Sequence, residues 1–292
     1  RGTGKTEGVV APRALHNFHA LPRGNGFILG ETYSQIKGGT LPAMMAAWEQ
    51  LGFIEDKHYW VGKMPPAKLD LPKPHRSPKQ DALKHYVSTY TGAGLYMFSQ
   101  DRPGISNGSR THWGIIDEAK FINKVQFDQE TMPTMIAAPP DKDWPKKVEY
   151  KSLLFLSDMP NKPKAMWLLN ARDEMETEVI EQIMWLRKQL LILEEKLETA
   201  AESTQVKIRA KMQKLQGYLV DLRIGTTYFS TASTLDNIHA IGMDSIQHML
   251  RTLSVFDFEL SVLNKEILKL EDNFYSVLDE DKHGYTMDNH NF

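Results

Sequence analysis

Short apolar runs that end abruptly at polar residues set the pattern of the first half of the chain. Residues 113–116 are apolar and lead directly into Asp117 and Glu118, and residues 26–30 and 152–157 repeat the arrangement. Short apolar runs with polar boundaries are typical of buried strands in a parallel sheet. We therefore predict an α/β fold with a central, mostly parallel sheet.

Other segments show helical or hairpin patterns. Residues 41–51 place Leu41, Met44, Met45 and Trp48 on one helical face, which favours core packing. We also predict a β-hairpin over 85–99, a broken helix over 121–135, a strand over 226–232 and an amphipathic helical stretch over 245–267. The proline-rich, basic segment 65–78 is predicted to be an exposed loop, either a plain connector or a contact for a phosphate backbone.

Residues 173–223 have the most regular pattern in the chain. Apolar residues recur at spacings of three and four in two runs, 183–197 and 208–222, and the phase slips between them. Each run predicts a coiled-coil seam. Ser203 and Thr204 are candidate caps for a second helix. We therefore predict an antiparallel helical hairpin, either a self-packed structural arm or a lever or docking arm for a partner.

Composition limits the class of protein. The 292 residues carry a formal charge of −2, with 41% hydrophobic and 25% charged residues, as is ordinary for soluble globular proteins. No apolar run approaches the ~18 residues of a membrane helix, and no signal-peptide pattern is present. Cysteine is absent, which excludes disulfides and thiolate metal sites. Near-neutral charge means that any contact with nucleic acid must use local patches.

The paired carboxylates Asp117 and Glu118 are the first candidates for chemistry. Ligands of open α/β sheets bind outside the carboxyl ends of the strands. Neighbouring side chains point to opposite sides of a strand, so one carboxylate can serve a metal while the other reaches a water. The alternative is an ordinary strand end.

The opening residues, 1–6, read Arg-Gly-Thr-Gly-Lys-Thr and match the end of the phosphate-binding pattern G-x-x-x-x-G-K-S/T. Gly2 and Gly4 allow backbone amides to approach phosphate oxygens, Lys5 reaches the terminal phosphates, and Thr6 offers a hydroxyl to Mg²⁺. The alternative is a flexible polar terminus. The first glycine of the pattern and its supporting strand are expected upstream of residue 1.

Several further residues are candidates with open alternatives. Tyr33 and Gln35 either line the nucleotide crevice or only end a strand. Arg102 and Arg110 belong to a glycine-rich loop that suits an arginine stabilising transition-state charge, or are ordinary surface residues. Ser157 ends its apolar run where it could couple hydrolysis to motion, or it simply precedes a turn. The last candidates, which could ligate a metal but more often face water, are Asp279, Asp281 and His283.

In order and spacing, these pieces resemble the ATPase domain of the large terminase subunit of tailed double-stranded DNA phages. Five stretches carry the resemblance. They are residues 1–6, similar to its Walker A motif with an arginine ahead of G-K-T; 30–35, similar to the loop after its second strand; 115–119, similar to its Walker B motif with the catalytic glutamate; 155–157, similar to its coupling motif; and 234–239 with 273–283, similar to the stretch linking ATPase to nuclease.

The resemblance implies a P-loop NTPase of the additional-strand type that uses ATP and Mg²⁺ to drive double-stranded DNA into a viral capsid. The residues implied to bind nucleotide are Gly2, Thr3, Gly4, Lys5 and Thr6. Thr6 and Asp117 are implied for Mg²⁺, with Glu118, Arg1 and Ser157 as catalytic residues. The implied partners are DNA, a portal protein, a small terminase subunit and further copies in a ring, in the host cytoplasm and without a membrane.

We expect an ATPase domain over residues 1–232, with the helical insert at 173–223, and a linker subdomain over 233–292. The insert is longer than the family usually has there. The nuclease carboxylates of the family would lie beyond residue 292, so no nuclease activity is predicted from this sequence. Two alternatives remain, another P-loop nucleic-acid motor of helicase type and a non-hydrolysing interaction module built on the helical hairpin.

Overall fold

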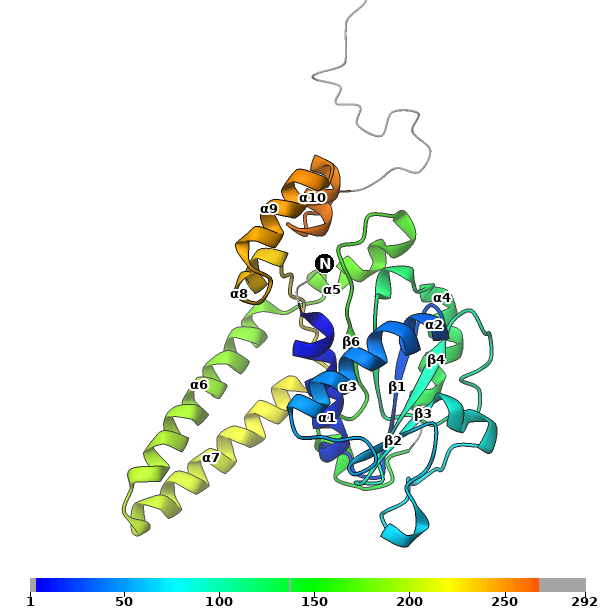
Figure 1. Ribbon diagram of the computed structural model, residues 1–292. Helices are drawn as coiled ribbons and strands as arrows, with labels where there is room; N and C mark the ends of the chain where they lie inside the picture. Colours follow the sequence, from blue (N-terminus) through cyan, green and yellow to red (C-terminus); the bar gives the residue numbers. More distant parts are fainter. Residues whose placement is uncertain (1–3, 137, 268–292) are drawn as a thin grey trace, which may run out of the picture.

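A six-stranded sheet with the order β2-β3-β4-β1-β5-β6 lies at the centre of the computed structural model, which describes residues 4–136 and 138–267 (Figure 1). Strands β4, β1, β5 and β6 are parallel, and β3 is antiparallel to both of its neighbours. The strands are β1 Asn25–Gly30, β2 Tyr59–Val61, β3 Tyr86–Thr89, β4 Gly94–Ser99, β5 Trp113–Ile116 and β6 Ser152–Phe155. The predicted α/β fold with a mostly parallel sheet is confirmed.

The middle of the sheet is buried on both faces. Every residue of β1, β4 and β5 is buried, as expected for parallel strands covered on both sides. Gly114 on β5 lies opposite Phe27 on β1, and a Cβ added there would come within 2.2 Å of the Phe27 ring. The Phe27 ring therefore uses the space that a side chain at position 114 would need.

One face of the sheet is covered by two helical stretches. A π-helical turn, Thr6–Val10, continues into α1, Ala11–Ala20. Helix α2, Tyr33–Gln35, and a π-helical turn, Ile36–Thr40, lead into α3, Leu41–Gln50. The predicted helix over 41–51 is confirmed, with Leu41, Met44 and Trp48 buried and Met45 partly buried.

The opposite face is covered by irregular helical turns. Helix α4, Lys124–Gln126, is followed by a π-helical turn, Phe127–Thr131, and a 3₁₀ segment, Met132–Ile136. Phe127 and Met135 pack there against side chains of β1, β4 and β5. The broken helix predicted for 121–135 is therefore confirmed.

The antiparallel side of the sheet follows the predicted hairpin. Strands β3 and β4 pair across the turn at 90–93. The proline-rich segment contains the 3₁₀ turn Ala67–Leu69 and is otherwise irregular. Strand β2, which pairs antiparallel with β3, was not predicted. Its three residues give too short a pattern to recognise.

A long helical hairpin projects from the sheet domain (Figure 1). It consists of α6, Thr177–Thr199, and α7, Glu202–Arg223, and follows the 3₁₀ segment Pro163–Leu169 and the short α5, Asn170–Asp173. The hairpin prediction is confirmed. The predicted caps Ser203 and Thr204 are wrong, because α7 already begins at Glu202, after Ala201, and has no side-chain cap.

The chain then leads into a small helical unit. Residues 226–232 form no strand, so that prediction is wrong, since no neighbouring strand is available to pair with them. A 3₁₀ turn, Thr234–Asn237, leads into α8, Ile238–Ile241, α9, Met243–Thr252, and α10, Val255–Ser261. The stretch predicted over 245–267 is thus helical, but it breaks between α9 and α10.

Two predictions from the sequence concern residues beyond the described ranges at the carboxyl end. They are the motif at 273–283 and the metal candidates Asp279, Asp281 and His283. Over the described residues, no helix is both long and apolar enough to cross a membrane. The boundary placed at residue 232 stays a prediction.

Candidate active site

Three segments that are distant in sequence meet at the carboxyl edge of the sheet. Lys5 precedes the first helical turn, Glu118 follows β5, and Asp158 follows β6. The Lys5 Nζ lies 3.9 Å from Glu118 Oε1 and 2.5 Å from Asp158 Oδ1. The structure therefore places the glycine–lysine turn beside Glu118, the second of the paired carboxylates, whereas Asp117 does not line the cavity that these residues form.

The backbone around Gly4 makes a left-handed turn into a helix. Gly4 has φ of +70°, a value that glycine adopts without steric cost. Its carbonyl accepts a hydrogen bond from the Gly8 amide at 2.7 Å. The first amides of a helix lack partners within the helix and favour anions. Arg1, Gly2 and Thr3 of the predicted phosphate loop lie outside the described residues.

These segments enclose a cavity of about 550 Å³. That volume falls within the range typical of small-molecule sites. Most of the residues that line it are polar or charged, and they include two lysines and three carboxylates. The lining residues are Gly4, Lys5, Thr6, Glu7, Ala43, Glu118, Lys120, Phe121, Asp158 and Asn237.

Asp117 is nearly buried, with 6% of its surface exposed. Its Oδ2 accepts a 2.5 Å hydrogen bond from the Thr40 hydroxyl, and its Oδ1 accepts one from the Glu118 amide at 3.1 Å. Thr40 immediately precedes α3, and the sequence analysis did not identify it. Its hydroxyl orients the carboxylate predicted to hold Mg²⁺.

Glu118 has a strained backbone at the end of its strand. Its φ of 49° and ψ of 47° lie in the left-handed region, which is uncommon for a residue with a side chain and is often found at functional sites. Burial raises the pKa of the Glu118 carboxyl above its ordinary value, although the nearby Lys5 opposes the shift. Oε2 is buried and has no hydrogen-bond partner among the described residues. A carboxylate with a raised pKa is suited to accept a proton from water.

Asp158 and Lys120 were not predicted as site residues. Burial alone would raise the pKa of Asp158, but the hydrogen bond and charge of Lys5, followed by the charge of Lys120, hold it well below its ordinary value. Lys120 Nζ lies 3.1 Å from Asp158 Oδ2 and 3.9 Å from Glu118 Oε2. The two lysines and two carboxylates thus form one charged cluster.

Ser157 and Asp236 take supporting positions. The Ser157 Oγ accepts a hydrogen bond from the Lys120 amide at 3.1 Å, which ties the end of β6 to the residues after β5. Asp236 accepts hydrogen bonds from the amide and hydroxyl of Ser233 and so caps its own turn. The neighbouring Asn237 lines the cavity instead.

The helical unit at the carboxyl end of the chain also contacts the end of β6. The Met159 amide donates a 3.0 Å hydrogen bond to Asn264 Oδ1, just after α10. Met159 directly follows Asp158. Asp158 is therefore one residue away from a contact with this helical unit.

Tyr33 and Gln35 do not line the cavity. The Tyr33 ring stacks on His85, with centroids 3.7 Å apart, and Gln35 Oε1 accepts a hydrogen bond from the Glu31 amide at 3.1 Å. Both residues belong to α2, which begins after β1 has ended at Gly30, so they form the helical turn that follows the strand and do not line the crevice.

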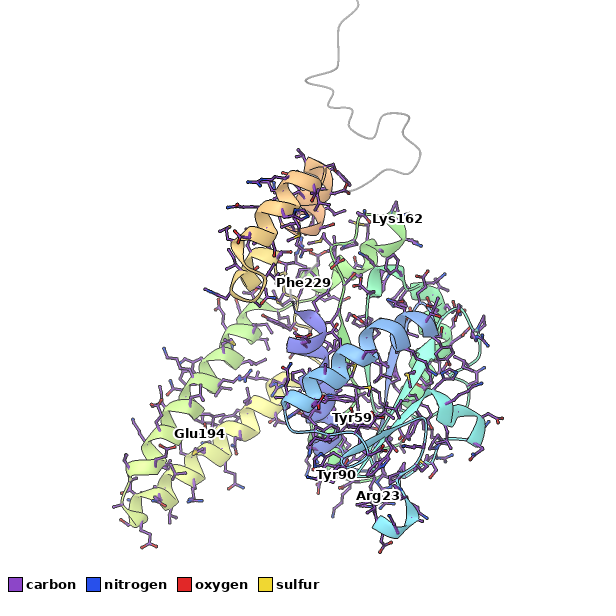
Figure 2. The ribbon with its side chains drawn as sticks, in the orientation of Figure 1. Arg23, Tyr59, Tyr90, Lys162, Glu194 and Phe229 are labelled. Atoms are coloured by element: carbon purple, nitrogen blue, oxygen red, sulfur yellow. The ribbon has the colours of Figure 1, made fainter. Side chains whose placement is uncertain are left out.

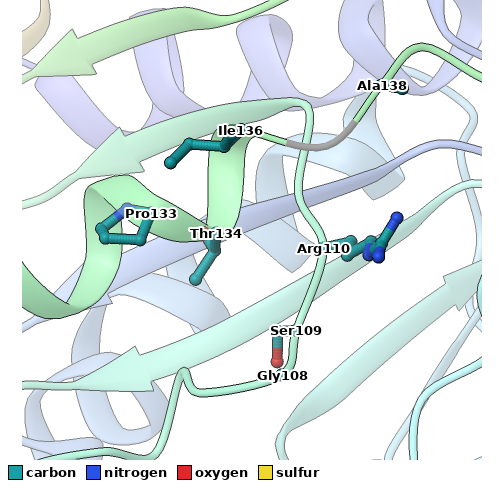
Figure 3. A pocket seen from close by; sticks show the side chains of 7 residues that line it. All are labelled: Gly108, Ser109, Arg110, Pro133, Thr134, Ile136 and Ala138. Carbon is teal, nitrogen blue, oxygen red and sulfur yellow. The ribbon is translucent and has the colours of Figure 1, made fainter.

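Arg102 and Arg110 lie in different places. Arg102 follows β4 at the carboxyl edge of the sheet and is near enough to Tyr33 to lower the pKa of that phenol, although burial raises it more. Arg110 precedes β5 and lines a second cavity of about 410 Å³, together with Thr134 and Ile136 (Figure 3). Because Glu118 follows β5, Arg110 is at the opposite end of that strand and is a poor candidate for the transition-state arginine.

Comparisons with known proteins find similar solved structures. No family model matches the chain, and no curated protein does. The structure is similar to the large terminase ATPase domain of Thermus phage P74-26, with 15% identity, a TM-score of 0.47, and coverage of 91% of this chain and 86% of that one. A variant of that domain with one arginine replaced by alanine gives 14% identity and a TM-score of 0.45, with the same coverage.

Proposed function

We propose that this chain hydrolyses ATP at the cavity between Lys5, Glu118 and Asp158. The single observation that carries the proposal is the placement of the Lys5 ammonium 3.9 Å from Glu118 at the mouth of a polar cavity. Phosphoryl transfer needs little more than positioning and charge compensation. In this proposal Lys5 and the helix amides bind the phosphates, and Glu118 orients or deprotonates the attacking water.

The residues present also suit a magnesium ion. Mg²⁺ prefers hard oxygen ligands and is usually held by one or two protein groups together with water and phosphate. The Thr6 hydroxyl and the Asp117 carboxylate are such ligands. The described residues contain no cluster of three or more His, Cys, Asp or Glu side chains that could hold a metal, so water and phosphate would have to complete the coordination. When bound, Mg²⁺ would offset the charge of the phosphates. Thr40 would keep the Asp117 carboxylate in a fixed orientation.

Binding of phosphate requires Lys5 to exchange partners. Lys5 donates to Asp158 in the structure, so a phosphate must compete with that carboxylate. Lys120 already contacts the other oxygen of Asp158 and would keep the carboxylate paired after Lys5 turns to the phosphate. In this proposal, Lys120 therefore prevents an uncompensated charge inside the site, which would be costly.

The proposal extends from ATP hydrolysis to a motor function. The order of motifs along the sequence supports translocation of double-stranded DNA into a viral capsid, with a portal protein and a small terminase subunit as partners and further copies of the chain in a ring. The host cytoplasm is the corresponding location. Arg1 remains the proposed transition-state arginine and Ser157 the proposed coupling residue. The contact between Met159 and Asn264 offers a route from Asp158 to the helical unit beyond the hairpin.

A titration with ATP, with and without Mg²⁺, tests the nucleotide site, and single-turnover hydrolysis tests the reaction. We expect Glu118→Gln to keep ATP binding and to reduce hydrolysis by roughly 10²–10⁴-fold, the usual contribution of a general base. Glu149→Gln, which changes a partly buried glutamate far from the cavity, is the matched control. Normal turnover in Glu118→Gln would remove Glu118 from this role, and no ATP binding by the unaltered chain would refute the nucleotide site.

A further inference from the structure

The helical hairpin is held together by one thin apolar seam. In α6 the buried residues are Ile183, Leu186, Leu190 and Leu193, whereas α7 has no fully buried residue. At a rise of 1.5 Å per residue, the 23 residues of α6 extend roughly 35 Å. Figure 2 shows Glu194 far out on this arm, and Phe229 near its base. Most of the surface of both helices is therefore open to a partner.

The two flanks of the seam carry different residues. Successive residues are about 100° apart around a helix. In an antiparallel pair the second helix runs in the opposite direction, so the order of its residues around the helix axis is also reversed when both helices are viewed from one end. Side chains that lie to the same side of the apolar seam in each helix therefore come together on one face of the pair. One such face, which we call the basic face, combines lysines and aromatic residues with one carboxylate. These exposed residues are Glu178, Trp185 and Lys196 of α6 and Lys207, Lys211, Lys214 and Tyr218 of α7.

The cations of the basic face have no acidic partners. No carboxylate in the described ranges forms an ion pair with Lys207, Lys211 or Lys214. The Lys214 ammonium lies over the Tyr218 ring, 5.8 Å from its centroid. Between Glu202 and Asp221, at its two ends, α7 contains no acidic residue. With four lysines and one carboxylate, Glu178, this face has a net positive charge.

The other flank has a different composition. It brings Arg187, Glu194 and Glu198 of α6 together with Arg209 of α7, so both signs of charge are present. Mixed signs are typical of a solvated helical surface, whereas cations segregated to one side indicate a polyanion. Two exposed aromatic side chains, Trp185 at 58% and Tyr218 at 50%, accompany the cations and add surfaces on which bases can stack.

We propose that the basic face of the hairpin binds the phosphodiester backbone of nucleic acid. The overall charge of the chain is −2, so attraction to a polyanion must come from a local patch, and the basic face is such a patch. Lysine contacts to phosphates give affinity without sequence preference. This inference rests on the motor part of the proposed function, in which DNA is the substrate, and it names the surface of the hairpin that would hold the DNA.

The test compares two triple variants of the full chain. The first combines Lys207→Gln, Lys211→Gln and Lys214→Gln on the basic face. The control combines Arg187→Gln, Lys188→Gln and Arg209→Gln, which removes the same charge from other exposed positions of the hairpin. Binding to a fluorescein-labelled DNA duplex of mixed sequence, and to a single strand of equal length, is followed by anisotropy over a series of salt concentrations.

We expect the basic-face variant to bind at least roughly tenfold more weakly and its salt slope to fall by about 3, because each lost phosphate contact removes about 0.9 from the slope. The control should retain the slope of the unaltered chain. If the basic-face variant loses affinity for the duplex, the face binds double-stranded DNA. If it loses affinity only for the single strand, the face binds the phosphodiester backbone of single-stranded DNA. Unchanged binding, or equal losses in both variants, would overturn the proposal.

Two measurements separate this result from other causes. Far-UV circular dichroism should show the same helix content in all variants, because every replaced residue is exposed. ATP affinity should also be unchanged, so failure of the nucleotide site and failure of the basic face remain distinguishable. If light scattering showed lost self-association while DNA affinity stayed constant, the face would belong to a second copy of the chain and the proposal would be refuted.

Discussion

Lysines occupy two contrasting environments in this molecule. At the edge of the sheet, Lys5 and Lys120 each lie within 4 Å of two carboxylates. On the hairpin, Lys207, Lys211 and Lys214 have no such partner among the described residues. In the first region the protein supplies its own counter-charges, and a ligand must displace them. In the second, the surrounding solvent or an external anion must supply them. Lysine therefore belongs to a network of ion pairs that a ligand can rearrange in the first region, and to an exposed binding surface in the second.

The largest effect is expected at Lys5. Lys5→Met removes the cation that faces the cavity and should weaken ATP binding by roughly 100-fold or more, since charge-assisted contacts to phosphate are among the strongest in such sites. Isothermal titration with a non-hydrolysable ATP analogue checks this. Lys188→Met, on an exposed helical position, is the control and should bind as the unaltered chain does. Equal affinity in Lys5→Met would show that the cavity does not bind triphosphate through this lysine.

A smaller and opposite effect is expected at Asp158. Because Asp158 competes for Lys5, Asp158→Asn should tighten ATP binding by up to roughly tenfold, a modest gain since the ion pair is partly exposed to solvent. Lys120→Met should weaken binding, because Asp158 then loses one of its cationic partners and holds Lys5 more strongly.

A double-mutant cycle gives the decisive measurement for this exchange. If Lys120 acts through Asp158, Lys120→Met should have almost no effect in the Asp158→Asn background. Lys120→Arg, which retains the charge, should restore binding. Additive effects of the two substitutions would show that Lys120 acts on the nucleotide directly or only supports the fold.

These residues also show what the sequence could reveal. The positions of Lys5, Asp117 and Glu118 follow from local patterns, because a glycine turn and a strand end each leave a signature in a few consecutive residues. Thr40 reaches Asp117 from the turn before α3, and Asp158 reaches Lys5 from the end of β6, which are contacts between segments distant in sequence. Lys120 lies two residues after Glu118, but its ion pair with Asp158 likewise depends on the pairing of β5 with β6. The false strand at 226–232 has a related cause, since β-forming residues need a neighbouring strand, and none pairs there.

The pH dependence of the reaction is expected to shift in opposite directions in the two cavity variants. Glu118 must be ionised to act as a base, so kcat/KM should fall as pH decreases through the pKa of Glu118, which burial raises above its ordinary value. The Asp158 charge contributes to raising this pKa, and the Lys120 charge lowers it. Asp158→Asn should therefore move the acidic limb to lower pH and Lys120→Met to higher pH. If kcat/KM fell at the same acidic pH in both variants, Glu118 would not be the base of the reaction.

The smallest effect on ATP hydrolysis is expected from the seam of the hairpin. Leu190 packs between the two helices and is 8% exposed, so Leu190→Ala should loosen the arm by about 2 kcal/mol, the lower end of the usual range because the seam is thin. Hydrogen exchange should then speed up over residues 177–223 but not over the sheet, whereas Leu95→Ala in β4 should lower the stability of the whole sheet domain. ATP affinity should be unchanged in Leu190→Ala. Faster exchange in both regions would show that the arm and the sheet unfold as one unit, and the contrast between the two lysine environments would then not reflect two independent regions.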